Sequence, residues 1–165
     1  MEKELQIVGL RIGRETLGLP IALVREIVRV PEITPVPNAP DYIEGVINLR
    51  GRIIAVIDLR KRFGQPAEEI DKKSRIVVVE TENRQVGLLV SSASEVLRIS
   101  PSDIEAPRSV FPNEELDYVT GVGKLKDRLI ILLDLDRILQ KAELGIVNEV
   151  TNLSDTLAEV GASRR

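Results

Sequence analysis

The sequence contains no histidine, no cysteine and no tryptophan. Zinc, haem, copper and iron–sulfur centres depend on histidine or cysteine ligands, so the composition excludes these centres. It also excludes disulfides and nucleophilic catalysis by serine–histidine or cysteine–histidine pairs. Only oxygen-ligated Mg²⁺ or Ca²⁺ is left open. We therefore expect a protein without a cofactor and without a bound metal.

Aromatic residues and net positive charge are also scarce. The chain has two Phe and two Tyr, and 23 basic residues stand against 26 acidic ones, for a net charge of −3. Nucleic-acid-binding proteins usually present a basic face, often with aromatic stacking platforms. No apolar run approaches the ~20 residues of a membrane span, and the acidic, polar start MEKELQ is unlike a signal peptide. We expect a cytoplasmic protein that binds no nucleic acid and does not insert into a membrane.

What the 165 residues do contain is a series of short apolar runs, rich in Val, Ile and Leu and separated by turn signals. Runs of this length and spacing are typical of β-strands in compact sandwiches or barrels. The predicted strands are Leu5–Ile12, Thr16–Pro20, Ile27–Val30, Gly45–Leu49, Ile53–Ile57, Ile76–Glu80, Gln85–Val90, Val96–Ile99, Val119–Lys124 and Leu129–Leu133. The fold class is therefore mainly β.

Two short helices are predicted at 58–63 and 134–141, each opened by an aspartate. Asp58 and Asp134 stand where an aspartate accepts hydrogen bonds from the first backbone N–H groups of a helix. A carboxylate pair for acid–base chemistry is the alternative, and capping explains both positions better. The Pro-rich stretch 100–117 predicts a long loop with one helical turn.

The chain also contains an internal repeat. Residues 42–63 align with 118–139 without a gap, with eight of 22 positions identical, and 7–30 align with 76–99. The identical pairs include Gly45/Gly121, Leu49/Leu125, Arg52/Arg128, Asp58/Asp134, Glu26/Glu95 and Arg29/Arg98. A unit of about 70 residues has a marginal core by itself, so two units are expected to bury a shared apolar surface.

The repeat predicts two tandem small β-barrels packed side by side. We expect the first barrel within residues 1–70, the second within 71–141 and a helical tail at 142–165, all within one domain. Whether strands are exchanged between the halves stays open. The tail carries a heptad-like stripe at Ile146, Val150, Leu153, Leu157 and Val160. Such a helix docks either on its own barrel or on a partner.

The two copies diverge at one hairpin turn, where Asn48-Leu49-Arg50-Gly51 stands opposite Lys124-Leu125-Lys126-Asp127. Gly51 can adopt a positive φ, so the turn is expected to present Arg50 outward. A guanidinium there suits bidentate pairing with a carboxylate of a partner. An ordinary solvated hairpin tip is the alternative. The nearby basic residues Arg50, Arg52, Arg60, Lys61 and Arg62 are either a patch for an acidic partner or a solvated face.

The order of these motifs resembles the CheW family of chemotaxis coupling proteins over residues 4–145. The resemblance rests on PIALVREIVRV, PNAPDYIEG, GVINLRGRIIAVIDLRKRFG, VGLLVSSASEVL and YVTGVGKLKDRLIILLDLDRIL. It implies two five-stranded, Src-homology-3-like barrels and no enzymatic activity. It also implies an adaptor that bridges the cytoplasmic tips of methyl-accepting chemoreceptors to the histidine kinase CheA. Further implied partners are the regulatory domain of CheA and other CheW copies, assembled in rings beneath the membrane receptor arrays.

The resemblance assigns candidate residues to each partner. Receptor binding is implied for Gly45, Asn48, Leu49, Arg50, Gly51, Ile27, Ala93 and Val96. Kinase binding is implied for Val24, Glu26 and Val28, although the division of Val24 and Glu26 between the two partners stays open. A second ring contact is implied for Arg108–Phe111.

Three other functions are weighed against this one. An adaptor in a related chemosensory pathway, with surface motility or a second messenger as output, would use the same contacts. A nucleic-acid-binding double barrel is supported only by the small barrels and the basic cluster. A small-molecule hydrolase or lyase using Asp, Glu or Lys would need an enclosed polar pocket with perturbed carboxylates.

Overall fold

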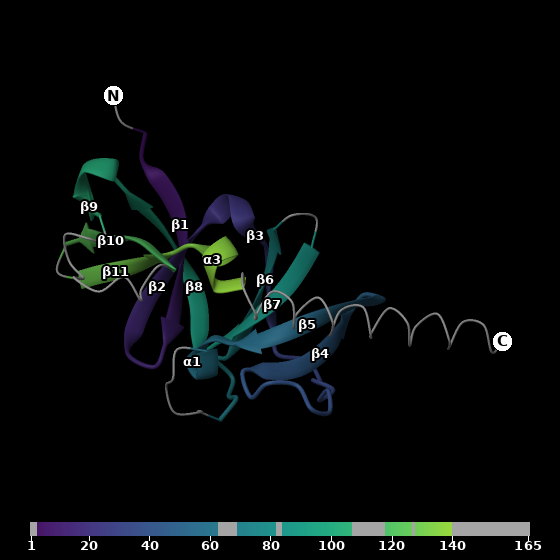
Figure 1. The fold of residues 1–165 in the computed structure, drawn as a ribbon. Helices are drawn as coiled ribbons and strands as arrows, with labels where there is room; N and C mark the ends of the chain where they lie inside the picture. Colours follow the sequence, from purple (N-terminus) through teal and green to yellow (C-terminus); the bar gives the residue numbers. More distant parts are fainter. Residues whose placement is uncertain (1–2, 63–68, 82–83, 107–117, 127, 140–165) are drawn as a thin grey trace.

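The computed structural model describes residues 3–62, 69–81, 84–106, 118–126 and 128–139, and the chain is mainly β (Figure 1). The strands are β1 (Leu5–Ile12), β2 (Glu15–Pro20), β3 (Val24–Arg29), β4 (Ile43–Leu49), β5 (Arg52–Asp58), β6 (Arg75–Thr81), β7 (Arg84–Val90), β8 (Ser92–Ile99), β9 (Ile104–Glu105), β10 (Val119–Leu125) and β11 (Arg128–Leu133). The helical segments are short: η1 (Ile21–Leu23), α1 (Leu59–Arg62), η2 (Pro101–Asp103) and α3 (Leu135–Leu139).

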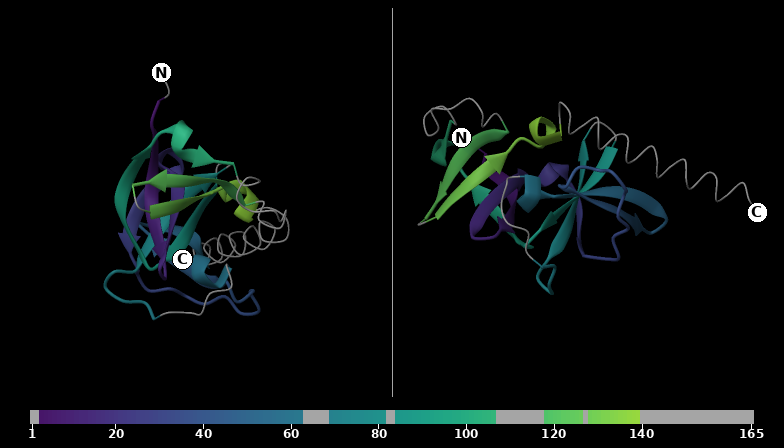
Figure 2. Two further views of the ribbon diagram at one scale, coloured as in Figure 1. Left: turned by 90° about the vertical axis from the view of Figure 1, so that its left-hand side faces the viewer. Right: turned by 60° about the horizontal axis from the view of Figure 1, so that its bottom comes forward.

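The strands form two sheets that lie next to one another (Figure 2). One sheet has six strands in the order β8-β1-β2-β11-β10-β9, and the other has five in the order β3-β6-β7-β5-β4. Most neighbours are antiparallel, but β2 pairs with β11, and β5 pairs with β7, in parallel. Each sheet thus takes strands from both copies of the repeat. The two sheets therefore do not divide at residue 70, where the sequence places the boundary between barrels.

All ten predicted strands are present, with ends that differ by a few residues. The largest difference is at β8, which begins four residues earlier than predicted. The two-residue strand β9 is not predicted by the sequence, whereas the helical turn before it is. The tail 142–165 and the segment Arg108–Phe111 lie outside the described residues. No helix within the described part of the chain is long and apolar enough to cross a bilayer.

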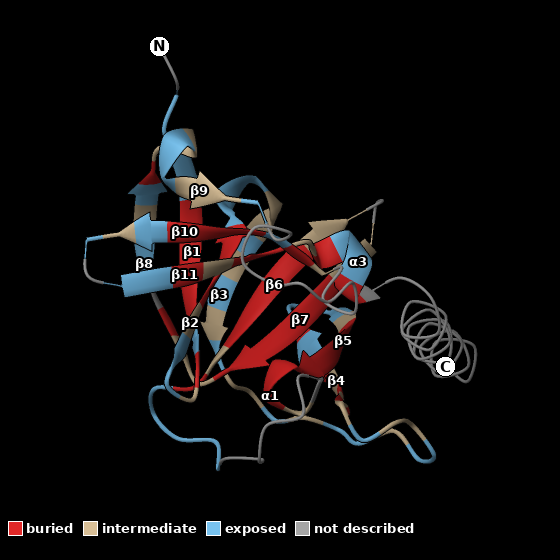
Figure 3. Ribbon diagram, turned by 60° about the vertical axis from the view of Figure 1, so that its left-hand side comes forward, coloured by how far each residue is buried: buried red, intermediate tan, exposed pale blue. Residues whose placement is uncertain are grey.

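The buried side chains of the described residues form a central cluster and two smaller ones. Figure 3 shows buried residues along most of β6 and β7. The central cluster joins both sheets and both helices, and includes Leu10, Leu19, Leu59, Val77, Leu88, Val90 and Leu135. A second cluster lies within the five-stranded sheet, around Ile47, Val56 and Val78. A third lies within the six-stranded sheet, around Ile7, Ile99 and Ile130. All three clusters contain residues of both copies, so the apolar surface shared between the copies that the repeat predicts is present, and its largest part joins the two sheets.

After the aligned residues Tyr42 and Tyr118, the two copies share a β-bulge, a backbone hydrogen bond and a helix cap. A β-bulge marks Gly45 in β4 and Gly121 in β10. The backbone N–H of Asp58 donates to the carbonyl of Tyr42 at 2.7 Å, and Asp134 donates to Tyr118 at the same distance. Both aspartate side chains then accept a backbone N–H from the first turn of the following helix. The capping role is confirmed for both aspartates.

Arg60 is buried and is paired with the capping aspartate of its own helix. The Asp58 carboxylate accepts from Arg60 Nε at 3.1 Å and from Nη2 at 3.2 Å. Arg60 and Asp58 are only 2% and 1% exposed. The basic cluster expected around Arg50 is therefore not one surface patch, because one of its members is used inside the fold.

Replacing Arg60 is expected to destabilise the fold strongly. Arg60→Met leaves the buried Asp58 carboxylate without its guanidinium, which costs about 3 kcal/mol or more. Arg52→Met is the matched control, since Arg52 is exposed and its pairing contributes at most about 1 kcal/mol. Urea denaturation of both variants measures the difference. Equal losses would mean that the buried pair is not needed for stability.

Adding a side chain at Gly45 is expected to destabilise the fold about as much as replacing Arg60. Its φ is +146°, and an added Cβ would lie 2.1 Å from the carbonyl oxygen of Thr34. Gly45→Ala should therefore lower the free energy of unfolding by about 3 kcal/mol. Gly51→Ala is the control: its φ of +88° is strained, but no atom lies within 4 Å of the added Cβ. That variant should lose about 1 kcal/mol. A Gly45→Ala protein with an unchanged midpoint would contradict this account of the bulge.

Candidate functional site

The hairpin between β4 and β5 closes through a two-residue turn. Leu49 pairs with Arg52, and between them Arg50 and Gly51 have φ values of 52° and 88°. Positive φ at both central residues is the type I′ geometry that fits the twist of a hairpin. The Asn48 Oδ1 accepts the backbone N–H of Gly51 at 2.9 Å, which holds the turn closed. Arg50 therefore stands on the outside of the turn, as the sequence predicts.

Glu26 of β3 joins this turn to the opposite edge of the sheet. Its Oε2 accepts a hydrogen bond from Arg50 Nη2 and lies 4.0 Å from Arg52 Nη2. Arg52 in turn donates from Nη1 to Gln85 Oε1 at 2.6 Å. Since β3 and β4 are the two edge strands of the five-stranded sheet, the sheet curls until its edges approach one another. The Arg50 side chain is still 65% exposed, whereas that of Glu26 is only 25% exposed. Arg50 is thus oriented by Glu26 and can be reached from solvent.

The candidate residues of β3 lie on two faces of the strand. Val24, Glu26 and Val28 are half-buried, and alternate with exposed residues that include Ile27. Val24 packs against the central core, and Val28 against the cluster within the five-stranded sheet. A register shift between Val24 and Glu26 separates the three residues assigned to the kinase: Val24 pairs with Val79 on the face of the central core, whereas Glu26 and Val28 pair with Val78 and Ile76 on the other face. Ile27 is exposed.

Three of the residues assigned to the receptor are buried. Gly45 lies under Thr34 at the bulge of β4, Leu49 belongs to the cluster within the five-stranded sheet, and Ala93 of β8 belongs to the central core. They position the backbone around the turn and the start of β8. The assigned residues that a partner can reach are Asn48, Arg50, Gly51, Ile27 and Val96.

The second copy contains a related pair of charges. Arg128 of β11 donates to Glu95 of β8 at 2.8 Å, in the positions that Arg52 and Glu26 hold in the first copy. Lys126 has a φ of 54° and corresponds to Arg50. The role of Glu26 as the partner of Arg50 is not apparent from the turn motif. The internal alignment could have indicated this role, because Glu26 aligns with Glu95 and Arg52 aligns with Arg128.

The shifted pKa values in the described residues all favour the ordinary charged form. A hydrogen bond to Glu44 raises the pKa of Lys61, and one to Glu105 raises the pKa of Lys124. Backbone N–H groups, first that of Lys73, lower the pKa of Asp71. A general acid or base at neutral pH needs shifts in the opposite direction. The described residues also contain no group of three or more acidic side chains placed to hold a metal.

Comparison with known proteins gives one family. Residues 6–143 match the model of the CheW-like domain. The chain is 38% identical over 141 residues to the chemotaxis protein CheW of Helicobacter pylori, covering 85% of this chain and 84% of that one. It is 35% identical over 139 residues to CheW of Thermotoga maritima, covering 84% and 90%.

A solved structure agrees with the sequence matches. The scaffolding protein TtCheW of Thermoanaerobacter tengcongensis superposes with a TM-score of 0.76 at 39% identity, over 87% of this chain and 96% of that one. The family match spans both sheets and the Arg50 turn. The chain therefore belongs to the CheW family of chemotaxis scaffold proteins, which are not enzymes.

Proposed function

We propose that this protein couples the cytoplasmic tips of methyl-accepting chemoreceptors to the histidine kinase CheA. The observation that carries the proposal is the exposed Arg50 guanidinium, held on a rigid type I′ turn and oriented by Glu26. A planar guanidinium in a fixed position can pair in a bidentate manner with a carboxylate or with backbone carbonyls. The match to the CheW family supports the same function.

The receptor contact combines this cation with exposed apolar side chains. Ile27 on β3 and Val96 on β8 are 39% and 59% exposed. A receptor tip is a helical hairpin, and a helix binds by placing apolar side chains against such surfaces while polar groups set its register. In this arrangement Arg50 sets the register, and Ile27 and Val96 supply apolar contact.

The kinase contact uses the edge of β3 around Glu26. Because Glu26 also holds Arg50, the two contacts share one ion pair. A receptor carboxylate that draws Arg50 away leaves Glu26 free for a cationic or N–H group of the kinase. The regulatory domain of CheA and further CheW copies then extend the assembly into rings in the cytoplasm, where many modest contacts add up through avidity.

The finer architecture belongs to the same proposal. Each sheet curls around its own small apolar cluster and is one of the two Src-homology-3-like barrels. Both barrels take strands from both copies, so the two are parts of one domain. This arrangement leaves β3 and β8 at the sheet edges, where the candidate partner residues lie.

Arg50→Ala is expected to weaken binding to a chemoreceptor cytoplasmic fragment by about tenfold or more, because it removes charge-assisted hydrogen bonds. Stability should change by less than about 1 kcal/mol, since the pair with Glu26 is exposed on the arginine side. Isothermal titration calorimetry measures the affinity. Arg14→Ala, at the exposed turn between β1 and β2, is the matched control. Unchanged receptor affinity in Arg50→Ala would refute the site, and a wild-type protein that binds neither receptor nor CheA would refute the function.

Glu26→Gln separates the two contacts. It removes the carboxylate proposed for the kinase and keeps the shape of the side chain. Affinity for the CheA regulatory domain should fall by about tenfold, while affinity for the receptor fragment falls less than in Arg50→Ala. A receptor loss equal to that of Arg50→Ala, with CheA binding intact, would place Glu26 on the receptor side instead.

A further inference from the structure

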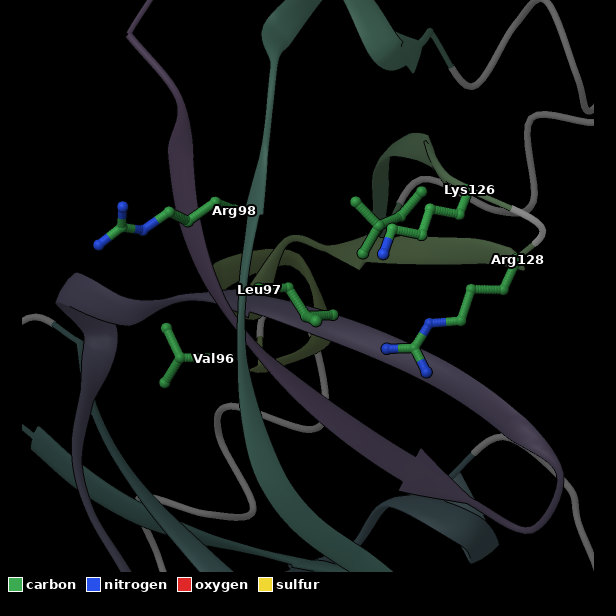
Figure 4. A pocket seen from close by; sticks show the side chains of 6 residues that line it. Val96, Leu97, Arg98, Lys126 and Arg128 are labelled. Carbon is green, nitrogen blue, oxygen red and sulfur yellow. The ribbon is translucent and has the colours of Figure 1, made fainter.

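The second copy of the repeat carries an open hollow between β8 and the tip of the β10–β11 hairpin (Figure 4). Its volume is about 570 Å³. The lining residues are Val96, Leu97, Arg98, Leu125, Lys126 and Arg128. Three of them are cationic and three are apolar, which is an unusual surface in a protein with a net charge of −3.

Every lining residue has a counterpart at the proposed site of the first copy. In the internal alignment the six correspond, in order, to Ile27, Val28, Arg29, Leu49, Arg50 and Arg52. The chain therefore presents the same surface twice. The proposed receptor–kinase site uses the surface around Arg50 together with Val96, and it assigns no role to Lys126 or Arg98.

The two surfaces differ in how their charges are paired. In the first copy Glu26 lies near both Arg50 and Arg52. In the second, Glu95 is paired with Arg128. Lys126 and Arg98 form no ion pair with any residue that the structure describes. Lys126, on the hairpin side of the hollow, is thus available to a carboxylate from outside, and Arg98 is available on the opposite side of β8.

The apolar part of this surface is also more exposed than its counterpart. Val96 is 59% exposed, against 39% for Ile27. Val96 and Arg98 point to one side of β8, and Leu97 points to the other side, toward the hairpin (Figure 4). In the sheet, β8 is an edge strand that pairs with β1 on one side only. The edge of a strand can add an extended segment through its backbone groups.

We propose that this hollow binds an extended acidic segment of a partner protein along the edge of β8. Carboxylates on the face of the segment toward the hairpin pair with Lys126, and the alternating apolar side chains on the other face pack against Val96. The site shares Val96 with the proposed receptor contact, but Lys126 belongs to this site alone, so the Lys126→Glu and Arg50→Ala variants let the two sites fail independently. It would give the adaptor a second point of attachment on the opposite copy of its repeat.

The test uses the full chain, isotopically labelled, and a short synthetic peptide of alternating glutamate and valine. Chemical-shift changes on titration should cluster at 96–98 and 125–128. Lys126→Glu should weaken peptide binding by about tenfold or more, and raised salt should weaken it further. Lys72→Glu, an equal charge change at an exposed position before β6, is the matched control and should leave the affinity unchanged.

A peptide of alternating glutamine and valine distinguishes charge from apolar contact, and should bind much more weakly. Equal binding of the two peptides would overturn the proposal, as would shifts confined to the Arg50 turn or an unaltered affinity in Lys126→Glu. Tighter binding of a single-stranded oligonucleotide at the same residues would make the hollow a nucleic-acid site instead. Concentration-dependent sedimentation that Lys126→Glu abolishes would make a second copy of this chain the occupant.

Discussion

The fold depends on the parallel pairing of strands from different copies of the repeat, β2 with β11 and β5 with β7. These two pairings place strands of each copy in the sheet of the other. They also bring Leu19 of β2 and Leu88 of β7 into the same central core as Leu59 and Leu135 of the helices. Neither copy could bury this surface alone, because a unit of about 70 residues has too little interior. The duplicated sequence is therefore one cooperative structure.

Strand exchange also decides where the binding surfaces lie. With the inner positions occupied by the exchanged strands, β3 and β8 are left at the edges of their sheets. Each carries a repeated glutamate, and each glutamate meets an arginine from a hairpin that returns from the far part of the same sheet. The ion pairs contribute little to stability because they are exposed, but they hold a cation in a defined place. Positions that look equivalent in the sequence thus become two related but distinct surfaces.

Two arginines that are close in the sequence show why buried and exposed charges must be distinguished. Arg60 and Arg50 are both arginines of one basic run, yet the first is inside the protein with Asp58 and the second stands in solvent. The difference comes from the backbone: Arg60 follows a capping aspartate at the start of a helix that packs on β7, whereas Arg50 occupies the exposed turn between β4 and β5. Residue type alone would assign both to one patch.

The strands, the capping aspartates, the turn at Gly51 and the shared core follow from local patterns of apolar, capping and turn residues, and the sequence by itself determined them. The pairing of Glu26 with Arg50, the burial of Gly45, Leu49 and Ala93, and the hollow beside Lys126 required the tertiary structure. The reason is physical: periodicity reports which face of a strand is apolar, but not which distant strand lies beside it. Only the curl of the sheets and the exchange of strands between copies bring these residues together or remove them from solvent.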